Sequence, residues 1–349
     1  MRGEYKVPGG KLVAVEFELE PAGLAAVQLS GDFFLEPDGA LGRLEAALEG
    51  VSPDASVLAL SERIESAMAH DDVLIGFDAR AVAIAVRRAL GKSSSWRDHS
   101  FELIEDGPRS PAMHMALDQV YAEALSAGSR GPTLRVWQWG AGAVVIGSYQ
   151  SLRNEVDLGA AERHGICVVR RISGGGAMFV EPGSTITYSL VVPGSLVDGL
   201  SFEASYSFLD SWVLTALSDL GIAATYQPIN DIASPAGKIA GAAQRRLADG
   251  TVLHHVTMAY DIDAAKMLQV LRIGREKLSD KGTASATKRV DPLRRQTGMS
   301  RDAVVEALIA SFARQHTLIP SAPSASELAA AERLVSTKFA RQEWTARIP

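Results

Sequence analysis

Apolar and polar positions in the first ninety residues predict a small α+β domain. Residues 12–19 alternate between apolar and polar side chains in their second half, as a half-buried strand does, and residues 24–29 form a second short strand pattern. Asp78 is placed to cap a helix that Gly91 would end. Apolar residues at helical spacing predict three helices in all, over residues 40–48, 55–69 and 79–90.

A short polar segment from Gly91 to Ser95 marks the best domain boundary in the chain. The length of 349 residues agrees with two domains, because a domain typically has about 100–200 residues. We therefore expect an N-terminal domain over residues 1–91, a linker over residues 92–99 and a larger domain over residues 100–349.

The larger domain mixes strands with longer helices. Helices are predicted for residues 111–125, 201–220, a segment capped by Asp263, 301–316 and 326–339. Strands are predicted for residues 133–139, 143–148, 166–170, 185–192, 236–244 and 252–260. We expect residues 185–192 to return beside residues 166–170, and the last two strands to form a hairpin that turns at Asp249-Gly250.

Composition and charge argue against several classes of protein. The chain has 35 Lys and Arg against 41 Asp and Glu, a net charge of −6 that argues against a dedicated nucleic-acid-binding protein. A single cysteine cannot form an internal disulfide, which favours a reducing compartment. The N-terminus lacks the apolar run of a signal peptide, and no stretch approaches the ~18 apolar residues of a membrane-spanning helix. We expect a soluble, cytoplasmic protein that binds neither nucleic acid nor a membrane.

The segment from Arg170 to Gly176, Arg-Arg-Ile-Ser-Gly-Gly-Gly, is the first candidate for chemistry. Three glycines after a strand favour either a tight turn or a backbone cradle for phosphate. The two arginines favour the cradle, although neighbouring side chains on a strand point to opposite faces, so that at most one should face a ligand. The motif is not a Rossmann turn, and Gly237-Lys238-Ile239 lacks the Ser or Thr of a P-loop.

A second candidate segment contains Asp231, Lys238 and the pair His254-His255. Lys238 stands among small residues, either as a solvated lysine at a strand end or as a charge that holds an anionic substrate. Asp231 could bind Mg²⁺ with help from nucleotide phosphates. Adjacent histidines on a strand face opposite ways, so we expect one to be buried and one to line a pocket, and not a zinc site.

Cys167 lies in an apolar strand pattern, Ile-Cys-Val-Val, where cysteine usually behaves as a small core hydrophobe. We therefore predict a structural rather than a catalytic role for its thiol. The chain has no Gly-x-Ser-x-Gly elbow and no His-Glu-x-x-His helix.

Together these motifs resemble the lipoate-protein ligase A family of the biotin/lipoate ligase superfamily, over the chain from Ser110 onwards. The similar segments are residues 144–147 with Gln150, 170–179, 230–232, 238–244, 254–257, 279–290 and 338–344. Residues 6–12 and 31–35 resemble the small accessory domain that such ligases carry at the C-terminus or on a separate chain. In this chain the accessory domain would come first.

The resemblance implies an α+β fold: a class II synthetase-like biotin/lipoate ligase catalytic domain with mixed β-sheets and flanking helices, preceded by a small α+β accessory domain. It implies a two-step reaction in which ATP activates lipoate as lipoyl-AMP, and a lysine of a lipoyl domain then displaces AMP. The acceptors would be lipoyl domains of 2-oxoacid dehydrogenase complexes or the glycine cleavage H protein. An enzyme of this kind needs positioning and charge stabilisation more than a covalent nucleophile.

The resemblance also assigns residues. Lys238 would be catalytic and contact both lipoate and phosphate, and Asp231 would bind Mg²⁺. The strands at residues 144–146 and 168–169 would wall the acyl chain. The residues expected to bind nucleotide or substrate are Arg171, Gly174, Gly175, Gly176, Ala177, Met178, Phe179, Asp231, Lys238 and His255.

Two departures bear on the function. Val180 stands where family members often have a histidine after the glycine motif, which affects acid selection. The related octanoyl- and lipoyltransferases use a cysteine shortly before the Gly-Lys pair or late in the domain, and this chain has none after Cys167. This favours an ATP-dependent ligase over a transferase without ATP.

Three alternatives remain open: a transferase, a biotin ligase, whose usual Gly-Arg-Gly-Arg run is absent, and a non-catalytic lipoate-binding module. The charge pattern adds one expectation, a single basic site in an acidic protein that would suit ATP and a carboxylate. That site would bring together Arg170, Arg171, Lys238, Arg245 and Arg246.

Overall fold

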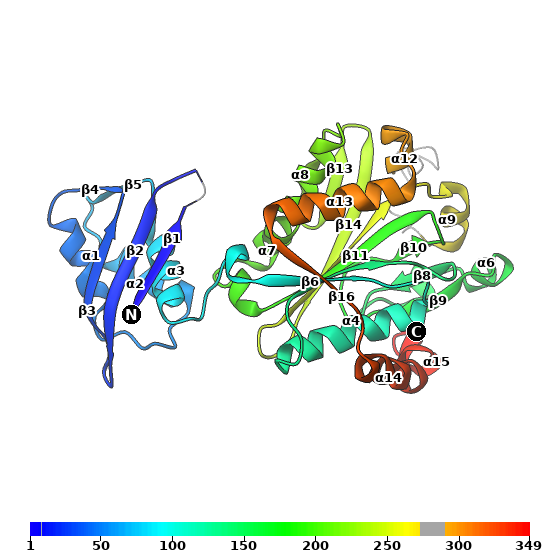
Figure 1. Cartoon of the computed structure of the whole chain (residues 1–349), viewed down its shortest axis with the longest axis horizontal. Coiled ribbons are helices and arrows are strands. Elements are labelled where there is room, and N and C mark those ends of the chain that lie inside the picture. Colours follow the sequence, from blue (N-terminus) through cyan, green and yellow to red (C-terminus); the bar gives the residue numbers. More distant parts are fainter. Residues whose placement is uncertain (8, 273–289) are drawn as a thin grey trace. The chain divides into compact units, whose positions relative to one another are not determined.

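The computed structural model describes residues 1–7, 9–272 and 290–349, which form two compact units (Figure 1). The N-terminal unit consists of Met1–Asp98 together with Gly194–Ser201. The large unit consists of His99–Pro193 and Phe202–Pro349. Each unit has its own apolar core, so each is described separately.

The N-terminal unit is built on a three-stranded antiparallel sheet with the order β1-β2-β3. Its elements are β1 (Arg2–Lys6), β2 (Leu12–Glu20), β3 (Gly23–Gly31), β4 (Phe34–Glu36), α1 (Ala40–Leu48), α2 (Val57–Ala67), β5 (Val73–Ile75) and α3 (Ala79–Ala89). The Asp78 side chain caps α3 by accepting from the Ala81 N–H at 2.7 Å. The two strands and three helices predicted here are confirmed, whereas β1 and the β4–β5 pair were not predicted.

The segment Gly194–Ser201 is part of the N-terminal unit although it follows a strand of the large unit. Arg87 pairs with Asp198, Nε to Oδ2, at 2.9 Å, and the Ser94 N–H donates to the Ser195 carbonyl at 2.9 Å. These contacts hold the segment between β11 and α7 within the N-terminal unit.

The large unit contains an eight-stranded sheet and a three-stranded sheet. The first has the order β12-β13-β14-β15-β11-β7-β6-β16, and its pairs are antiparallel except for β6 with β7 and with β16. Its strands are β6 (Ser100–Glu105), β7 (Thr133–Trp137), β11 (Thr185–Val192), β12 (Thr225–Gln227), β13 (Asp231–Ser234), β14 (Gly237–Arg246), β15 (Val252–Ala259) and β16 (Thr317–Ser321). The second has the order β10-β8-β9 and consists of β8 (Ala143–Ile146), β9 (Cys167–Arg170) and β10 (Met178–Val180).

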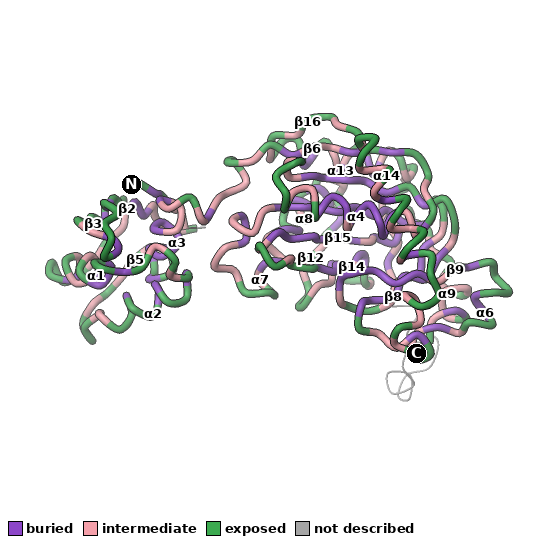
Figure 2. The backbone as a smooth tube through the Cα atoms, turned by 90° about the horizontal axis from the view of Figure 1, so that it is seen from below, coloured by how far each residue is buried: buried purple, intermediate pink, exposed green. Residues whose placement is uncertain are grey.

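Within the described residues, the large unit also contains α-helices. They are α4 (Pro111–Ser126), α5 (Leu152–Glu155), α6 (Leu158–Arg163), α7 (Phe202–Leu209), α8 (Ser211–Asp219), α9 (Ala264–Val270), α12 (Leu293–Thr297), α13 (Arg301–Gln315), α14 (Ala325–Leu334) and α15 (Gln342–Thr345). Every residue of β11 is buried, so both faces of the sheet are covered at its centre. Figure 2 shows buried residues concentrated along β14, β15 and α4.

The predicted hairpin is confirmed, because β14 pairs with β15 in antiparallel register around the turn at Asp249-Gly250. The predicted pairing of residues 185–192 with residues 166–170 is wrong. The second segment is β9, which pairs in parallel with β8, whereas the first is β11, between β7 and β15. The glycine segment turns the chain into β10, which takes the place beside β8.

The single helix predicted over residues 201–220 is also wrong, because the structure divides it into α7 and α8 at Asp210. The buried Asp210 carboxylate accepts from the Tyr188 hydroxyl and lies 2.7 Å from His254 Nε2. These contacts hold Asp210 toward the sheet, and its backbone departs from the helical conformation.

Candidate functional site

The glycine loop, residues 171–177, connects β9 to β10 and is closed by the side chain of Arg171. Its Nη2 donates to the Gly174 carbonyl at 2.6 Å and to the Gly176 carbonyl at 2.8 Å, and its Nε donates to Ser173 Oγ at 3.0 Å. Gly175 has a φ of +89°, a conformation that side-chain-bearing residues rarely adopt. Gly175 and Gly176 are exposed, so the loop presents its backbone to solvent.

The charge of Arg171 is not balanced by a carboxylate among the described residues. Arg171 is 4% exposed, and every hydrogen bond that it makes there goes to a carbonyl or hydroxyl oxygen. Burial lowers its pKa to about 10, which leaves the guanidinium charged at neutral pH. A buried cation without a counter-ion is costly, so an anion bound beside the loop would stabilise Arg171.

Arg170 faces the other way and has a structural role. Its guanidinium donates to the carbonyls of Gly147 at 2.9 Å, Gln150 at 2.6 Å and Thr345 at 2.7 Å. It thereby ties the C-terminal segment to the loop after β8. As strand alternation predicts, Arg171 lines a cavity and Arg170 does not.

Lys238 and Asp231 form an ion pair at the start of β14, with Nζ 2.7 Å from Oδ1. Their side chains are 47% and 37% exposed, so both can reach a bound molecule. A side chain at Gly241 would approach Lys238 Nζ to 2.9 Å, so the glycine leaves room for the lysine to lie across the strand. A small residue at position 241 is therefore required for the observed position of the Lys238 side chain.

Two adjacent cavities meet at Lys238. The polar cavity, of about 100 Å³, is lined by Arg171, Gly176, His255 and neighbours on β14. The apolar cavity, of about 310 Å³, is lined by Ala177, Met178, Phe179, Thr185, Lys238, Ile239, Ala240, Gly241, Thr257, Ala259, Ile262, Met267, Leu271 and Val290. Lys238 is among the residues that line both, so it stands where the environment changes from polar to apolar. The others are Ala177, Met178, Gly241 and Thr257.

The strands predicted to wall the acyl chain do not line the apolar cavity beside Lys238. Residues 144–146 are fully buried in the core, because both edges of β8 are paired and helices cover the sheet. Residues 168–169 line a different cavity, on the other side of β8 from β10. Val180, at the position where the family often has histidine, is fully buried in the core.

The two adjacent histidines differ as predicted. His254 is fully buried and lines neither cavity beside Lys238, whereas His255 lines the polar cavity. His255 Nδ1 lies 2.7 Å from Asp118 Oδ2, and His255 Nε2 lies 2.7 Å from Ser173 Oγ. Burial lowers the pKa of His255. The sequence analysis missed Asp118 because this residue, on α4, lies 137 residues away from His255 in the sequence.

The residues present fit Mg²⁺ only if a nucleotide supplies further ligands. No group of three or more His, Cys, Asp or Glu side chains is placed to hold a metal ion within residues 1–7, 9–272 and 290–349. Asp231 offers a single accessible carboxylate beside the polar cavity. Mg²⁺ is commonly bound by one or two carboxylates together with substrate phosphates.

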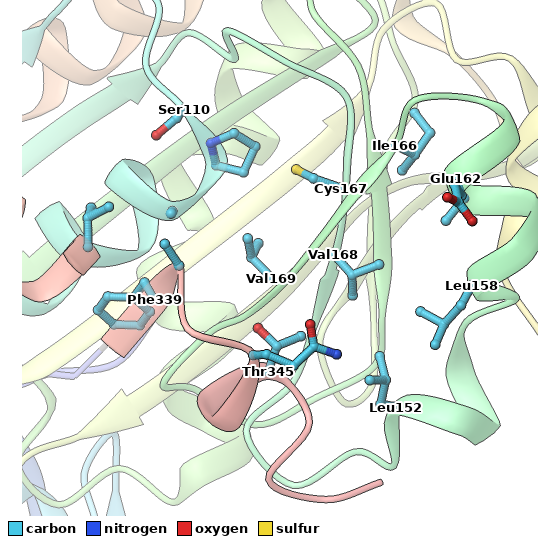
Figure 3. Close-up of a pocket in the computed structure, with 16 residues that line it drawn as sticks. Ser110, Leu152, Leu158, Glu162, Ile166, Cys167, Val168, Val169, Phe339 and Thr345 are labelled. Atoms are coloured by element: carbon cyan, nitrogen blue, oxygen red, sulfur yellow. The ribbon is translucent and has the colours of Figure 1, made fainter. Parts of the chain in front are cut away.

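Cys167 lines a separate cavity of about 550 Å³, between β9, α6 and the C-terminal segment (Figure 3). It is exposed, so the prediction of a core position is wrong: β9 is the edge strand of its sheet. The thiol donates to the Gly142 carbonyl at 3.3 Å, and desolvation raises its pKa. None of the residues that line this cavity lines either cavity beside Lys238.

The expectation of one site with five basic residues is wrong. Lys238 and Arg245 are seven residues apart on β14, which corresponds to about 23 Å along a strand. Arg245 lies near Lys338 in another small cavity, and Arg170 is occupied by backbone carbonyls. Only Arg171 and Lys238 of the five line the polar cavity.

The similar segments at residues 279–290 and 338–344 differ in how far the structure describes them. Residues 279–289 are outside the described residues, although Val290 pairs with Lys238 as an isolated bridge. In the C-terminal segment, Lys338 Nζ donates to Gln119 Oε1 at 2.7 Å and lies 4.2 Å from the centre of the Trp344 ring. This segment therefore packs on α4, away from the Lys238 cavities.

Comparison with known proteins identifies the family. The family model of the lipoyl protein ligase A/B catalytic domain matches residues 110–313, more than half of the chain. The chain belongs to this family. An octanoyltransferase LipM from Symbiobacterium thermophilum is 30% identical over 282 residues, which cover 73% of this chain and 99% of that protein. Subunit 1 of a lipoate-protein ligase A from Thermoplasma acidophilum is 27% identical over 259 residues, 69% of this chain and 94% of that subunit.

Solved structures agree with the family. A bi-partite lipoate protein ligase from Thermoplasma acidophilum, described with its E2 lipoyl domain, superimposes with a TM-score of 0.63 at 27% identity, covering 72% of this chain and 97% of that one. A lipoate-protein ligase A bound with ATP shares the fold, with a TM-score of 0.62 at 24% identity over 72% of this chain and all of that one. This family member therefore has the α+β biotin/lipoate ligase fold. No described helix is long and apolar enough to cross a membrane.

Proposed function

We propose that this chain is an ATP-dependent lipoate-protein ligase. The observation that carries the proposal is the position of Lys238 between an apolar cavity and a polar one whose buried Arg171 lacks a carboxylate partner in the described structure. An acyl chain would occupy the apolar cavity with its carboxylate at Lys238. The nucleotide phosphate would lie beside the glycine loop.

The chemistry that this arrangement supports is an acyl adenylation. A carboxylate oxygen of lipoate attacks the α-phosphorus of ATP, and the bond to pyrophosphate breaks. The ε-amine of the acceptor lysine then attacks the acyl carbon, an amide forms, and AMP leaves with the former carboxylate oxygen. Lys238 would offset the repulsion between carboxylate and phosphate, which opposes the first step.

Residues around Lys238 would hold it ready for that task. The ion pair with Asp231 orients the ammonium group toward the junction of the cavities, and Gly241 leaves space for its side chain. When Mg²⁺ accompanies the nucleotide, Asp231 would be one of its ligands, and the bound cation would help to neutralise the phosphate charge.

A transferase that works without ATP is the competing function, because the similar proteins include octanoyltransferases. A covalent acyl transfer of this kind needs an activated thiol beside the acyl site. The chain has one cysteine, and its thiol lines another cavity and has a raised pKa, which disfavours the reactive thiolate. These observations support the ligase.

The Cys167→Ser variant separates the two functions. We expect lipoate-driven ATP–pyrophosphate exchange by this variant to stay within about twofold of the parent, because the adenylation proposed here uses no thiol. Lipoate, octanoate and biotin should be compared in the same assay to define the preferred acid. Transfer from octanoyl acyl-carrier protein without ATP, lost in Cys167→Ser, would establish the transferase instead.

We further propose that the N-terminal unit is the accessory domain of the ligase and that lipoyl domains are its acceptors. Its apolar core is its own, and the similar archaeal ligase is bi-partite and was described with an E2 lipoyl domain.

Deleting residues 1–91 is expected to lower lipoylation of a lipoyl domain at least tenfold, because the segment Gly194–Ser201 then loses its packing partner. Residues 1–98 added as a separate chain should restore part of the activity. Full turnover by the truncated protein, with circular dichroism confirming its fold, would show that the unit has no accessory role.

A further inference from the structure

We propose that Asp118, His255 and Ser173 form a positioning relay that fixes the glycine loop through Arg171. The relay links the helix α4 and β15 of the eight-stranded sheet to the loop between β9 and β10 of the small sheet. This inference deepens the proposed function and rests on it for the meaning of the loop, but the contacts themselves do not depend on the reaction.

The hydrogen bonds of the relay have one consistent direction. His255 Nδ1–H donates to Asp118 Oδ2 at 2.7 Å, and His255 Nε2 then accepts from the Ser173 hydroxyl at 2.7 Å. Because the Ser173 hydroxyl hydrogen points to His255, the lone pairs of Ser173 Oγ are free to accept from Arg171 Nε at 3.0 Å. Arg171 Nη2 donates to the Gly174 and Gly176 carbonyls, and Nη1 donates to the Val145 carbonyl at 3.2 Å.

The far end of the relay is anchored in the core of the large sheet. Asp118 Oδ1 accepts from the Ser189 hydroxyl at 2.9 Å and lies 3.5 Å from Arg135 Nη1. Arg135 Nη2 in turn donates to His114 Nδ1 at 2.6 Å. Asp118 is therefore held from β11 and β7 as well as by its own helix, and it can determine the orientation of the His255 ring.

The same contacts exclude a direct chemical role for the three residues. Both ring nitrogens of His255 are occupied, so it has none left to take a proton from a substrate. Ser173 is 1% exposed and lines neither cavity beside Lys238. The order Asp-His-Ser is that of a hydrolase triad, but its hydroxyl faces Arg171 and not a substrate.

Ser173→Ala and His255→Ala test the relay, with His254→Ala as the matched control. His254 is the neighbouring residue on β15, is also buried and makes a contact of the same 2.7 Å length with a buried aspartate, Asp210. Its partner does not touch the glycine loop. A general loss of fold stability should therefore affect both histidine variants. A specific loss of loop positioning should affect only His255→Ala.

The readout is hydrogen exchange of the peptide that spans residues 172–180 in the full chain. We expect both relay variants to speed amide exchange in this peptide about tenfold, the factor typical for one lost hydrogen bond, whereas His254→Ala leaves it unchanged. In ATP–pyrophosphate exchange the KM for ATP should rise about tenfold with a smaller change in kcat. The Ser173→Ala/His255→Ala double variant should be no worse than either single variant, because both break one relay.

Unchanged exchange of this peptide in Ser173→Ala, which removes a single oxygen atom and leaves the core intact, would overturn the relay. Equal effects in His254→Ala and His255→Ala, or a covalent acyl group found on Ser173, would overturn it as well. If the parent protein shows no ATP–pyrophosphate exchange, the proposed function fails, and hydrogen exchange still decides the relay.

Discussion

Replacing Lys238 by alanine is expected to lower lipoate-dependent ATP–pyrophosphate exchange by about 10²–10³-fold, the usual effect of removing one preorganised charge from an active site. The ammonium group lies at the junction of the two cavities, where a carboxylate and a phosphate would meet. Asp231 would also lose its partner and would add its own repulsion to the bound anions. The rate of exchange at saturating ATP and lipoate measures the effect.

Lys266→Ala provides a matched control for this variant. Lys266 makes an ion pair with Glu181 at 2.7 Å, the same distance as the pair of Lys238, but lines neither of the two cavities beside Lys238. Its loss should change exchange less than twofold. Equal rates of ATP–pyrophosphate exchange for the Lys238 and Lys266 variants would show that Lys238 has no role in the site.

The Gly147→Ala variant is expected to lower exchange by about 10–100-fold. A Cβ atom at this position would lie 2.2 Å from the Gly175 carbonyl oxygen, which is backbone of the glycine loop and cannot rotate away. Overpacking of this kind costs about 1–3 kcal/mol, and here it must displace the loop or β8. The melting temperature and the KM for ATP together show how the cost is divided.

Gly42→Ala is the control for the glycine change. Gly42 lies within α1, where an added Cβ meets nothing within 4 Å, so stability should be unchanged or improved by up to about 1 kcal/mol. A wild-type rate of ATP–pyrophosphate exchange by Gly147→Ala would show that β8 and the glycine loop can separate. The close contact between Gly147 and Gly175 would then have no role in positioning the site.

Local sequence patterns predicted most individual elements but not how they pair. The hairpin of β14 and β15 was predictable because its turn and both strands are adjacent in the sequence. The partner of β11 was not, since a short apolar strand does not specify which distant strand lies beside it. The break at Asp210 depends on His254 and Tyr188, which no local pattern around Asp210 reveals.

The candidate site shows the same division. Arg171, Gly176 and Lys238 were found because they stand in compact motifs, and the structure brings them around one polar cavity. Asp118 was missed because its partner is distant in the sequence, although its burial within α4 indicates an internal bond. Arg245 was wrongly grouped with Lys238, because an extended strand carries residues that are near in sequence far apart in space.

The most direct test of the central claim is to incubate the purified chain with ATP, Mg²⁺ and lipoate, without any acceptor protein, and to analyse the products by mass spectrometry. We expect lipoyl-AMP and pyrophosphate in equal amounts, with far less of both for Lys238→Ala. Absence of the adenylate, together with an acyl group on the protein after incubation with an acyl thioester, would contradict it.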